Sequence, residues 1–419
     1  MNNFIFKISI IFLIVVFGFS SFSICDDYIE DDNPNTEKEI IESATTPTEE
    51  IKIPNTNSRA CVIIDRNTNS VLYGKNENQK RKMASTTKIM TATIIIENCN
   101  LNETVEISKK AAGTGGSRLG LKAGDKITIR DLLYGLMMRS GNDSAVALAE
   151  YAGGSIEGFA KKMNQKASDL GLNNTHFETP HGLDSDEHYT TAYELALLSN
   201  YALNNKIFAQ IVGTKEYTIT INGYPKQLSN TNELLGNLDG VYGIKTGFTN
   251  GANRCLVTAC KKNNMDIICV VLGADTKNFR TQDSVKLINY IFDNFKPVNI
   301  EKIVNDNFEK WKNNYLDKII INKSYSKNFD LKIENITNSV IPIRKDYIDL
   351  INVDINCPLY FEAPIYKNSK LGSINLHISD TINFEYPIYN SYEVKRKNWN
   401  IYFIDFFKDY SSTLSNLFL

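Results

Sequence analysis

Three short strings along the chain carry residue types suited to attack on a carbonyl carbon: Ser85-Thr86-Thr87-Lys88, Ser140-Gly141-Asn142 and Lys245-Thr246-Gly247. A serine hydroxyl becomes an effective nucleophile only when a base removes its proton. Ser85 and Lys88 are three residues apart, so they share a face if this segment is helical. A lysine that is partly removed from water can act as the base. The first string therefore indicates acyl transfer through a serine.

The second string supplies polar groups for the same chemistry. Ser140-Gly141-Asn142 lies between two segments with helical spacing, 129–138 and 144–151, and loops between regular elements often carry function. Ser140 can relay a proton between Lys88 and the leaving nitrogen. Asn142 can hold Lys88 and donate to a substrate amide oxygen. We therefore expect this loop to face the first string.

The third string is typical of a β-strand that binds an anionic substrate. Lys245 offers positive charge and Thr246 a hydroxyl, and both suit a carboxylate. Gly247 has no side chain, so an extended substrate can lie close to its backbone. The backbone N–H groups of Phe248 and Ser85 can together form an oxyanion hole.

Each string alone also fits an ordinary structural role: a capped helix start, a helix-capping turn, or a strand with a glycine bulge. The S-x-x-K spacing even recurs at Ser324-Tyr325-Ser326-Lys327, in a strand-and-turn context. Only the first three strings occur in the order and the secondary-structure context that a serine acyl-transfer site requires. Their combination favours the catalytic interpretation.

The elements around these strings predict an α/β (α+β) domain over 58–296, with helices around an antiparallel sheet. Strand patterns occupy 60–73 and then 241–273, where Gly251-Ala252-Asn253 supplies a turn. Segment 111–124 is glycine-rich and is expected to be a surface loop. The expected helices cover 85–98, 129–138, 144–151, 156–170, 191–204 and 284–295. Thr191 and Glu194 have the spacing of a capping box at one helix start.

The rest of the chain changes character after Lys296-Pro297. Short alternating runs predict a small all-β, sandwich-like domain over 297–392. Segment 395–419 begins with a basic cluster and predicts an amphipathic helix that binds a membrane surface. The alternative is a helix docked on its own domain. The apolar positions recur at steps of three and four: Trp399, Phe403, Phe406, Tyr410, Leu414 and Leu417.

The N-terminus predicts export. Lys7 precedes an apolar run from Ile8 to Phe19, and small residues follow, as in a secretory signal over 1–25. The alternatives are a retained anchor and lipidation at Cys25. Segment 26–57 is acidic, rich in Thr, Asn and Pro, and is expected to be a disordered linker. The enzyme is therefore expected at the extracytoplasmic face of the cell membrane or in the cell wall.

Composition excludes several other classes of function. The 419 residues have a net charge of −2, which gives no sign of a nucleic-acid surface. The seven cysteines are scattered without a C-x-x-C pair, and the four histidines lack ligand spacing. We expect no metal and no cofactor.

The motifs together resemble those of the low-molecular-mass penicillin-binding proteins, the serine-type D-Ala-D-Ala carboxypeptidases. The likeness covers roughly 57–295 and rests on the segments that contain the three strings, 82–88, 131–136 leading into 140–143, and 243–249. Met163-Asn164 and the segments 173–177 and 180–183 also match. One departure is Ala252-Asn253, where the family usually shows Ala-Gly.

The resemblance implies a β-lactamase/transpeptidase-like fold and an exported, membrane-associated enzyme. Its substrates would be peptidoglycan stem pentapeptides, from which it removes the terminal D-alanine, and β-lactam antibiotics would inhibit it. It also implies that Arg280 binds the terminal carboxylate of the substrate, a role that suits a guanidinium fork. A surface arginine is the alternative for this position.

Two other functions compete with this one. A β-lactamase needs a carboxylate for rapid deacylation, and Glu178 and Glu194 lie between the second and third strings. Glu178 belongs to the carboxypeptidase-like segment, however, and Glu194 fits a helix cap. A catalytically silent cell-wall-binding module is the second alternative, and the full set of candidate residues argues against it.

Overall fold

The computed structural model describes residues 51–324, 328–337, 339–379 and 382–417. Its largest sheet has five strands in the order β2-β1-β9-β8-β7, and each neighbouring pair is antiparallel. The strands are β1 (Ala60–Asp65), β2 (Val71–Lys75), β7 (Val241–Thr249), β8 (Asn253–Lys262) and β9 (Met265–Ala274). The two N-terminal strands thus complete a sheet whose other three strands come some 170 residues later, which confirms the expected antiparallel sheet.

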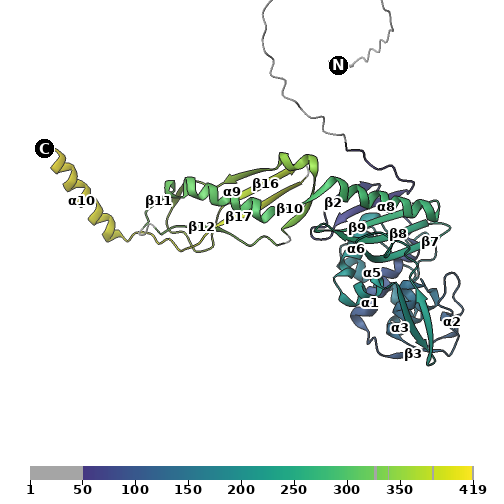
Figure 1. Cartoon of the computed structure of the whole chain (residues 1–419). Coiled ribbons are helices and arrows are strands. Elements are labelled where there is room, and N and C mark those ends of the chain that lie inside the picture. The colour runs from purple at the N-terminus through teal and green to yellow at the C-terminus, as the bar shows by residue number, and fades with distance from the viewer. Residues whose placement is uncertain (1–50, 325–327, 338, 380–381, 418–419) are drawn as a thin grey trace, which may run out of the picture. The chain divides into compact units, whose positions relative to one another are not determined.

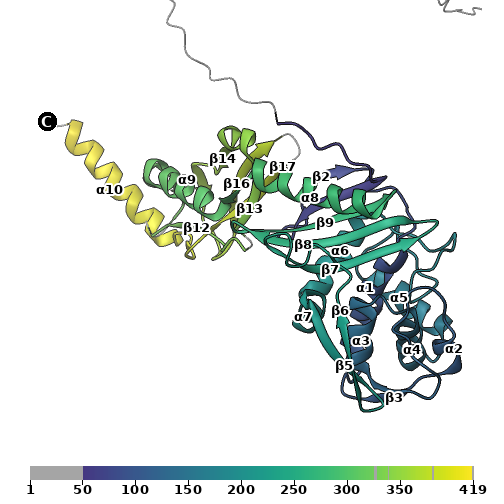
Figure 2. The same cartoon turned by 45° about the vertical axis from the view of Figure 1, so that its right-hand side comes forward.

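Helices cover both faces of this sheet (Figure 2). Helix α8 (Lys277–Asn294) packs on β8 and β9 from one side, and α6 (Ala192–Leu203) packs on β1 and β9 from the other. Alternate side chains of β1 divide between the two layers, because successive residues of a strand point to opposite faces. Cys61 and Ile63 join the cluster with α8, whereas Val62 and Ile64 join the larger helical core.

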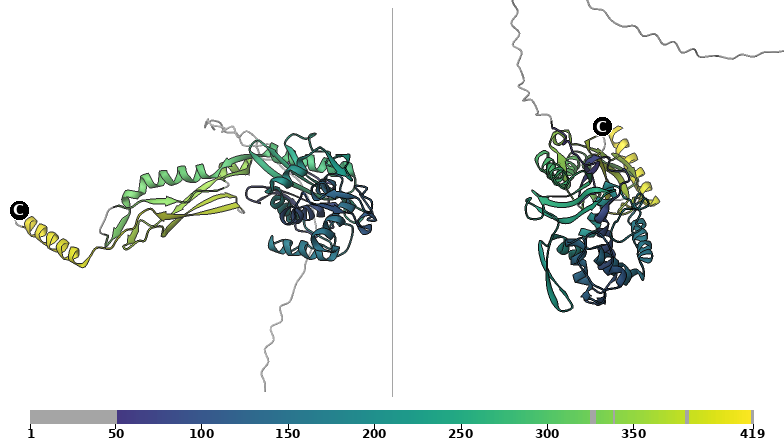
Figure 3. Two further views of the ribbon diagram at one scale, coloured as in Figure 1. Left: turned by 90° about the horizontal axis from the view of Figure 1, so that it is seen from below. Right: turned by 90° about the vertical axis from the view of Figure 1, so that its right-hand side faces the viewer.

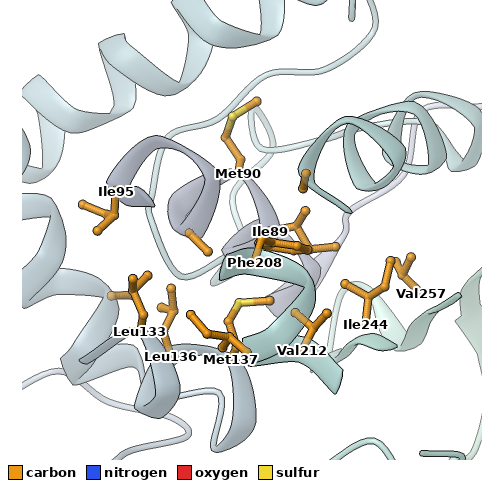
Figure 4. Close-up of a cluster of buried hydrophobic side chains, with 14 of the residues drawn as sticks. Ile89, Met90, Ile95, Leu133, Leu136, Met137, Phe208, Val212, Ile244 and Val257 are labelled. Atoms are coloured by element: carbon orange, nitrogen blue, oxygen red, sulfur yellow. The ribbon is translucent and has the colours of Figure 1, made fainter. Parts of the chain in front are cut away.

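The larger core surrounds α1 (Lys88–Asn98), whose first eight residues are all buried. Its neighbours include α3 (Ile129–Met138), α4 (Asn142–Gly153), α5 (Ile156–Asp169) and α7 (Lys206–Gly213). Figure 4 shows side chains from α1, α3 and α7 meeting those of β7 and β8 in this core. The buried part of α1 is held firmly in position by its neighbours, and it begins at the lysine of the first motif.

Ser85 lies in a 3-10 turn, η1 (Ala84–Thr87), which leads directly into α1. The expected helical segment 85–98 is therefore correct, but its first turn is tighter than an α-helix. Helix α3 has the expected bounds, and α4 extends the expected 144–151 by two residues at each end. Arg139-Ser140-Gly141 forms the short connection between them.

Smaller elements complete this part of the chain. The expected surface loop 111–124 begins inside a short helix and is anchored by Leu119 and Leu121, whose side chains are buried. Two antiparallel pairs, β3 with β4 and β5 with β6, lie outside the main sheet. The strands are β3 (Thr104–Glu106), β4 (Lys126–Thr128), β5 (Glu216–Ile221) and β6 (Tyr224–Ser229), and the short helix is α2 (Lys109–Ala112).

The expectation of an all-β domain over 297–392 is wrong, because a long helix, α9 (Ile300–Tyr315), opens this segment. The helix runs along a four-stranded antiparallel sheet, as the left view of Figure 3 shows. The four strands are β12 (Leu331–Ile333), β17 (Ile382–Asn390), β16 (Lys370–Ser379) and β14 (Asn352–Asn356). The core lies between helix and sheet, so the segment is not a sandwich of two sheets.

The sequence analysis did not predict this helix, because the helix buries only a narrow apolar stripe. Ile300, Val304 and Phe308 recur at steps of four and bury one stripe against the sheet, and Asn299 caps the first turn by accepting from the Lys302 N–H. The remaining short elements are β10 (Phe295–Asn299), η2 (Leu316–Lys318), β11 (Ile320–Asn322), β13 (Val340–Arg344), η3 (Lys345–Leu350) and β15 (Tyr360–Glu362).

The ends of the described chain differ partly from expectation. Residues 1–50, with the expected signal and most of the linker, lie outside the described residues, as does 325–327 of the second S-x-x-K string. Thr56 is buried, and the N–H of Asn57 donates to Asp283, so the linker ends before 57. Helix α10 (Trp399–Leu417, yellow in Figure 1) matches the expected C-terminal helix. Within the described ranges, none of the helices contains an apolar stretch of the length that spanning a bilayer requires.

Candidate active site

The residues of the first motif are in hydrogen-bonding contact. Lys88 Nζ lies 2.8 Å from Ser85 Oγ, 2.8 Å from Asn142 Oδ1 and 2.8 Å from the backbone oxygen of His181. The buried position of α1 holds the lysine, and the 3-10 turn before it presents the serine. The structure therefore brings the first two motifs together at one amine.

The environment of Lys88 favours the neutral amine. Its side chain is fully buried, and this burial, together with the charge of Lys245, moves its pKa well below the usual value for lysine. A neutral amine has two N–H groups and one lone pair. The two N–H groups can donate to Asn142 Oδ1 and to the His181 carbonyl, which leaves the lone pair for the proton of Ser85.

Asn142 is itself held in one orientation. Its Nδ2 donates to the backbone oxygen of Gly115, 2.7 Å away, so that Oδ1 must face Lys88. The next residue, Asp143, is fully buried and accepts from the backbone N–H groups of Leu119, Gly120 and Leu121. The second motif thus fastens the glycine-rich loop beside the site.

Ser140 has a backbone conformation that is uncommon for a residue with a side chain. Its φ is 58°, in the left-handed region, and it lines the same cavity as Ser85. Such backbone conformations cluster at active sites, where the surrounding structure enforces them. This position agrees with the expected place of Ser140 beside the nucleophile.

The third motif lies on β7, next to the turn that carries Ser85. A Cβ atom on Gly247 would lie 3.2 Å from the Ser85 nitrogen, so the strand approaches the nucleophile closely. Thr246 Oγ1 lies 3.0 Å from Thr231 Oγ1, and both residues line the cavity. Phe248 also lines it, and the Arg254 guanidinium stacks over the Phe248 ring at 3.6 Å.

Lys245 precedes Thr246 on β7 and is 1% exposed. Its Nζ donates to the backbone oxygen of Thr246 at 3.0 Å. Burial and the nearby charge of Arg280 lower the pKa of Lys245 to about 7. Lys245 can therefore change its charge near neutral pH, which an exposed lysine cannot do.

Arg280 is not a surface arginine, since it is only 4% exposed. It lies in the first turn of α8 and lines the cavity, and its Nη2 donates to Glu233 Oε1 at 2.9 Å. Its buried Nε has no hydrogen-bond partner. Glu233 also pairs with Lys277, at 2.6 Å. A buried guanidinium with an unused donor is suited to a further anion.

The cavity has a volume of about 500 Å³ and is predominantly cationic. Besides the expected residues it is lined by Arg139, Arg254 and Lys277, and Glu233 is the one carboxylate among the described lining residues. The sequence analysis did not single out these four. Three of them lie close in sequence to residues that were named: Arg139 directly precedes Ser140, Arg254 directly follows Asn253, and Lys277 lies three residues before Arg280.

The two carboxylates considered for a β-lactamase are engaged elsewhere. Glu194 accepts from the backbone N–H of Asn174, at 2.9 Å, and from the hydroxyl of Thr175. Thr191 caps the helix as expected, but the carboxylate of Glu194 does not complete a capping box. Glu178 accepts from the hydroxyl of Ser185. Neither lines the cavity that contains Ser85.

No group of three or more metal-ligating side chains (His, Cys, Asp or Glu) occurs among the described residues. The six cysteines from Cys61 onward are all free thiols, outside any disulfide. His181 and His188 are buried near Lys88, and burial lowers the pKa of His181 to about 3 and that of His188 to about 4. Both imidazoles are therefore neutral at physiological pH.

Comparison with known proteins gives the same result. Residues 44–276 match the peptidase S11 family model, described as D-alanyl-D-alanine carboxypeptidase. The chain is 34% identical over 325 residues to the D-alanyl-D-alanine carboxypeptidase DacF of Bacillus subtilis. This matched region covers 76% of this chain and 81% of DacF. It is 37% identical over 261 residues to DacC of Escherichia coli, which covers 59% of this chain and 64% of DacC.

Two solved structures are similar in fold. The carboxypeptidase DacD of Francisella tularensis has a TM-score of 0.66 and 27% identity, over 83% of this chain and 96% of that one. The DD-transpeptidase of Streptomyces K15 has a TM-score of 0.56 and 34% identity, over 58% of this chain and all of that one. The fold expected from the motifs is confirmed. This chain belongs to the D-alanyl-D-alanine carboxypeptidase family of serine peptidases, peptidase S11.

Proposed function

We propose that this protein is a serine D-Ala-D-Ala carboxypeptidase that removes the terminal D-alanine from peptidoglycan stem pentapeptides, and that β-lactams inhibit it. The observation that carries this proposal is the contact of Lys88 Nζ with both Ser85 Oγ and Asn142 Oδ1 beside a cationic cavity. The active site lies in a catalytic domain over 58–296. None of the described residues of the second domain, over 297–392, lines the cavity that contains Ser85.

Acylation begins at Ser85. Lys88 takes the hydroxyl proton, and Ser85 Oγ attacks the carbonyl carbon between the last two D-alanine residues. The negative charge that develops on the carbonyl oxygen is stabilised by the backbone N–H groups of Ser85 and Phe248. Ser140 passes a proton to the leaving D-alanine nitrogen, and the C–N bond breaks. Water then hydrolyses the ester and regenerates the serine.

Recognition depends on the substrate's terminal carboxylate. Thr246 and Arg280 bind it directly, Lys245 contributes positive charge from below, and Gly247 allows the peptide backbone to lie along β7. Asn142 donates to an amide oxygen of the stem peptide. The positive charge of Arg280 and Lys245 supports the assignment of the carboxylate site, and Thr246, Gly247 and Arg280 line the cavity.

Mass spectrometry of the purified protein tests this function. With penicillin we expect one covalent adduct, on Ser85, and with a pentapeptide ending in D-Ala-D-Ala we expect release of D-alanine. Ser85→Ala should abolish both reactions. Neither adduct nor D-alanine from the folded wild-type protein would refute the function and would leave the cell-wall-binding module as the better account.

The same experiment separates the enzyme from a β-lactamase. A carboxypeptidase of this kind holds the penicilloyl group for a long time, because it lacks a carboxylate that activates water for deacylation. Among the described residues, Glu233 is the one carboxylate that lines the cavity, and it is paired with Arg280 and Lys277. The positions of Glu178 and Glu194, both outside the cavity lining, support this expectation. Rapid turnover of penicillin would favour the β-lactamase instead.

We also propose that the protein is exported by its signal segment, 1–25, and binds the membrane surface through 395–419. Large apolar side chains are exposed along α10, among them Trp399 at 75% and Phe406 at 64%. A basic cluster precedes them at 395–397. This pattern supports an interfacial helix over one docked on its own domain. N-terminal sequencing and the intact mass of the cell-derived protein would detect an uncleaved anchor or a lipid on Cys25.

Vesicle co-sedimentation tests the membrane contact. The full chain should bind phosphatidylglycerol vesicles more strongly than phosphatidylcholine vesicles, and deletion of 398–419 should abolish binding. Replacing Trp399 and Phe406 by serine should weaken it. Tyr224→Ser is the matched control, since Tyr224 is equally exposed but lies on β6. Unchanged binding after the deletion would reject the anchor.

A further inference from the structure

Two glycines pack closely against the peptide unit that joins Ala84 to Ser85. On one side lies Gly247 of β7, where a Cβ would come within 3.2 Å of the Ser85 nitrogen. On the other lies Gly182, where a Cβ would come within 1.9 Å of the Ala84 carbonyl oxygen. Ala84 itself has a φ of 49°, an uncommon value for a residue with a side chain. The surrounding structure therefore enforces the conformation of this turn.

A directed chain of hydrogen bonds ends on the same peptide. His188 Nδ1 accepts from the backbone N–H of Glu178, at 3.0 Å, so this nitrogen carries no proton. The proton of the neutral imidazole is then on Nε2, which lies 2.8 Å from Thr87 Oγ1 and donates to it. The hydroxyl of Thr87 in turn donates to the Ala84 carbonyl oxygen, at 2.8 Å.

The far end of this peptide is the N–H group of Ser85. In a trans peptide the carbonyl and the N–H belong to one plane and point in opposite directions. A hydrogen bond to the carbonyl of Ala84 therefore fixes the direction of the Ser85 N–H. Hydrogen bonds in a chain also polarise one another, so the same contact strengthens the Ser85 N–H as a donor.

We propose that His188 and Thr87 are positioning residues of the oxyanion hole, which act through the Ala84–Ser85 peptide on the transition state of acylation. The inference rests on the proposed function, because it requires Ser85 to be the nucleophile. Neither residue touches the substrate, and Thr87 is buried behind the nucleophile. Their effect is on the rate of bond formation and not on the initial binding of the substrate.

Thr87→Val removes the hydroxyl at nearly constant shape. We expect the rate constant for acylation by penicillin to fall about 10- to 100-fold, as for a misplaced oxyanion donor, while the dissociation constant of the non-covalent complex stays within about twofold. Thr87→Ser restores the hydroxyl and should recover most of the rate.

Thr93→Val is the matched control, because Thr93 is buried on α1, the helix that directly follows Thr87, and its hydroxyl donates to a backbone oxygen, that of Ile89, at 2.8 Å. It removes an equivalent hydrogen bond without touching the Ala84–Ser85 peptide. A fall in acylation for Thr87→Val that Thr93→Val reproduces would mean that the hydroxyl serves stability alone, and would overturn the proposal.

Infrared spectroscopy of the penicilloyl-enzyme gives a second readout. The ester carbonyl of the adduct lies in the oxyanion hole, so weaker donation should move its stretching band to higher wavenumber in Thr87→Val and leave it unmoved in Thr93→Val. A band at the wild-type position would overturn the proposal. If wild-type Ser85 forms no adduct at all, the proposed function fails first, so the two failures are distinguishable.

Variants of His188 keep the proposal testable if Thr87→Val does not fold. His188→Gln retains a side-chain N–H that can reach Thr87, whereas His188→Leu does not. We expect the acylation rate constant to decrease in the order wild type, His188→Gln, His188→Leu. Equal rate constants for the two variants would contradict a role for donation from His188.

Discussion

Glu233 Oε1 accepts from Arg280 Nη2 at 2.9 Å, so the arginine expected to bind the substrate's carboxylate already holds a carboxylate of the protein. Burial tends to raise the pKa of Glu233, but the hydrogen bonds from Lys277 and Thr281 and the charge of Arg280 outweigh it and leave the pKa below its usual value. Glu233 is therefore ionised under physiological conditions. It compensates the buried guanidinium while the cavity is free of substrate.

This pair makes a prediction about substrate affinity. In Glu233→Gln no resident anion competes for Arg280, so KM for a peptide ending in D-Ala-D-Ala should fall several-fold, with kcat changed less than about twofold. Steady-state release of D-alanine measures both. A peptide with an amidated C-terminus should show no change in KM. A higher KM would mean that Glu233 orients Arg280 for binding instead.

The titration of Lys245 predicts that substrate binding weakens as the pH rises. Its pKa is about 7, lowered by burial and by the charge of Arg280, so its positive charge is present below about pH 7 and disappears above. KM for the carboxylate-bearing peptide should therefore rise as the pH passes through neutrality.

Arg280→Gln provides the check on this cause. Removing the neighbouring positive charge raises the pKa of Lys245. KM should be higher at every pH because one carboxylate donor is lost, but its increase should begin at a higher pH than in the wild type. If KM began to increase at the same pH in both proteins, the weaker binding at alkaline pH would be due to a group other than Lys245.

Asn142 allows the pKa of Lys88 to be moved in a known direction. Asn142→Asp places a carboxylate about where Oδ1 lies now, 2.8 Å from Nζ. An adjacent negative charge stabilises the ammonium and raises the pKa of Lys88, by about 1 to 3 pH units. Acylation by penicillin needs the neutral amine, so the pH below which the acylation rate constant falls should be higher in the variant than in the wild type. If the rate constant fell at the same pH in both proteins, Lys88 would not be the base.

Gly182 and Gly171 form a matched pair for the close contact behind Ser85. Both have positive φ, 83° and 71°, but only Gly182 has an atom within 4 Å of the position of a Cβ. Gly171→Ala should cost about 1 kcal/mol of backbone strain in the free energy of unfolding and leave penicillin labelling intact. Gly182→Ala should destabilise the protein more and slow labelling of the folded fraction. Equal urea midpoints and labelling rates would show that the contact is not tight.

Much of the active site was predictable because its signals are local. Helix 129–138 has a threonine cap and regular apolar spacing, and the structure has the same bounds. The three motifs each lie within a few residues, and their order indicates one site. Even Asn253, where the family usually has glycine, adopts a φ of 57°, a left-handed conformation that asparagine tolerates.

The residues that sequence reasoning missed depend on contacts between distant segments. Nothing near Glu233 in the sequence indicates that Arg280 lies beside it. Likewise His188 is 101 residues from its partner, Thr87, and resembles any other buried histidine. Helix α9 was missed for another reason: its apolar residues are few, and the alternating runs that follow it dominated the interpretation of that segment.

The pairing of β1 with β9 also bears on how the molecule is made. Cys61 is opposite Val271, so the first strand of the sheet cannot find its central neighbour until about 210 residues more have been synthesised. One edge of β1 can pair with β2 at once, but its other edge has no partner during that interval, and contacts between such distant segments form slowly. The catalytic sheet, and with it the strand that carries Lys245, can therefore assemble only as a late, nearly all-or-none event, after the whole domain has emerged.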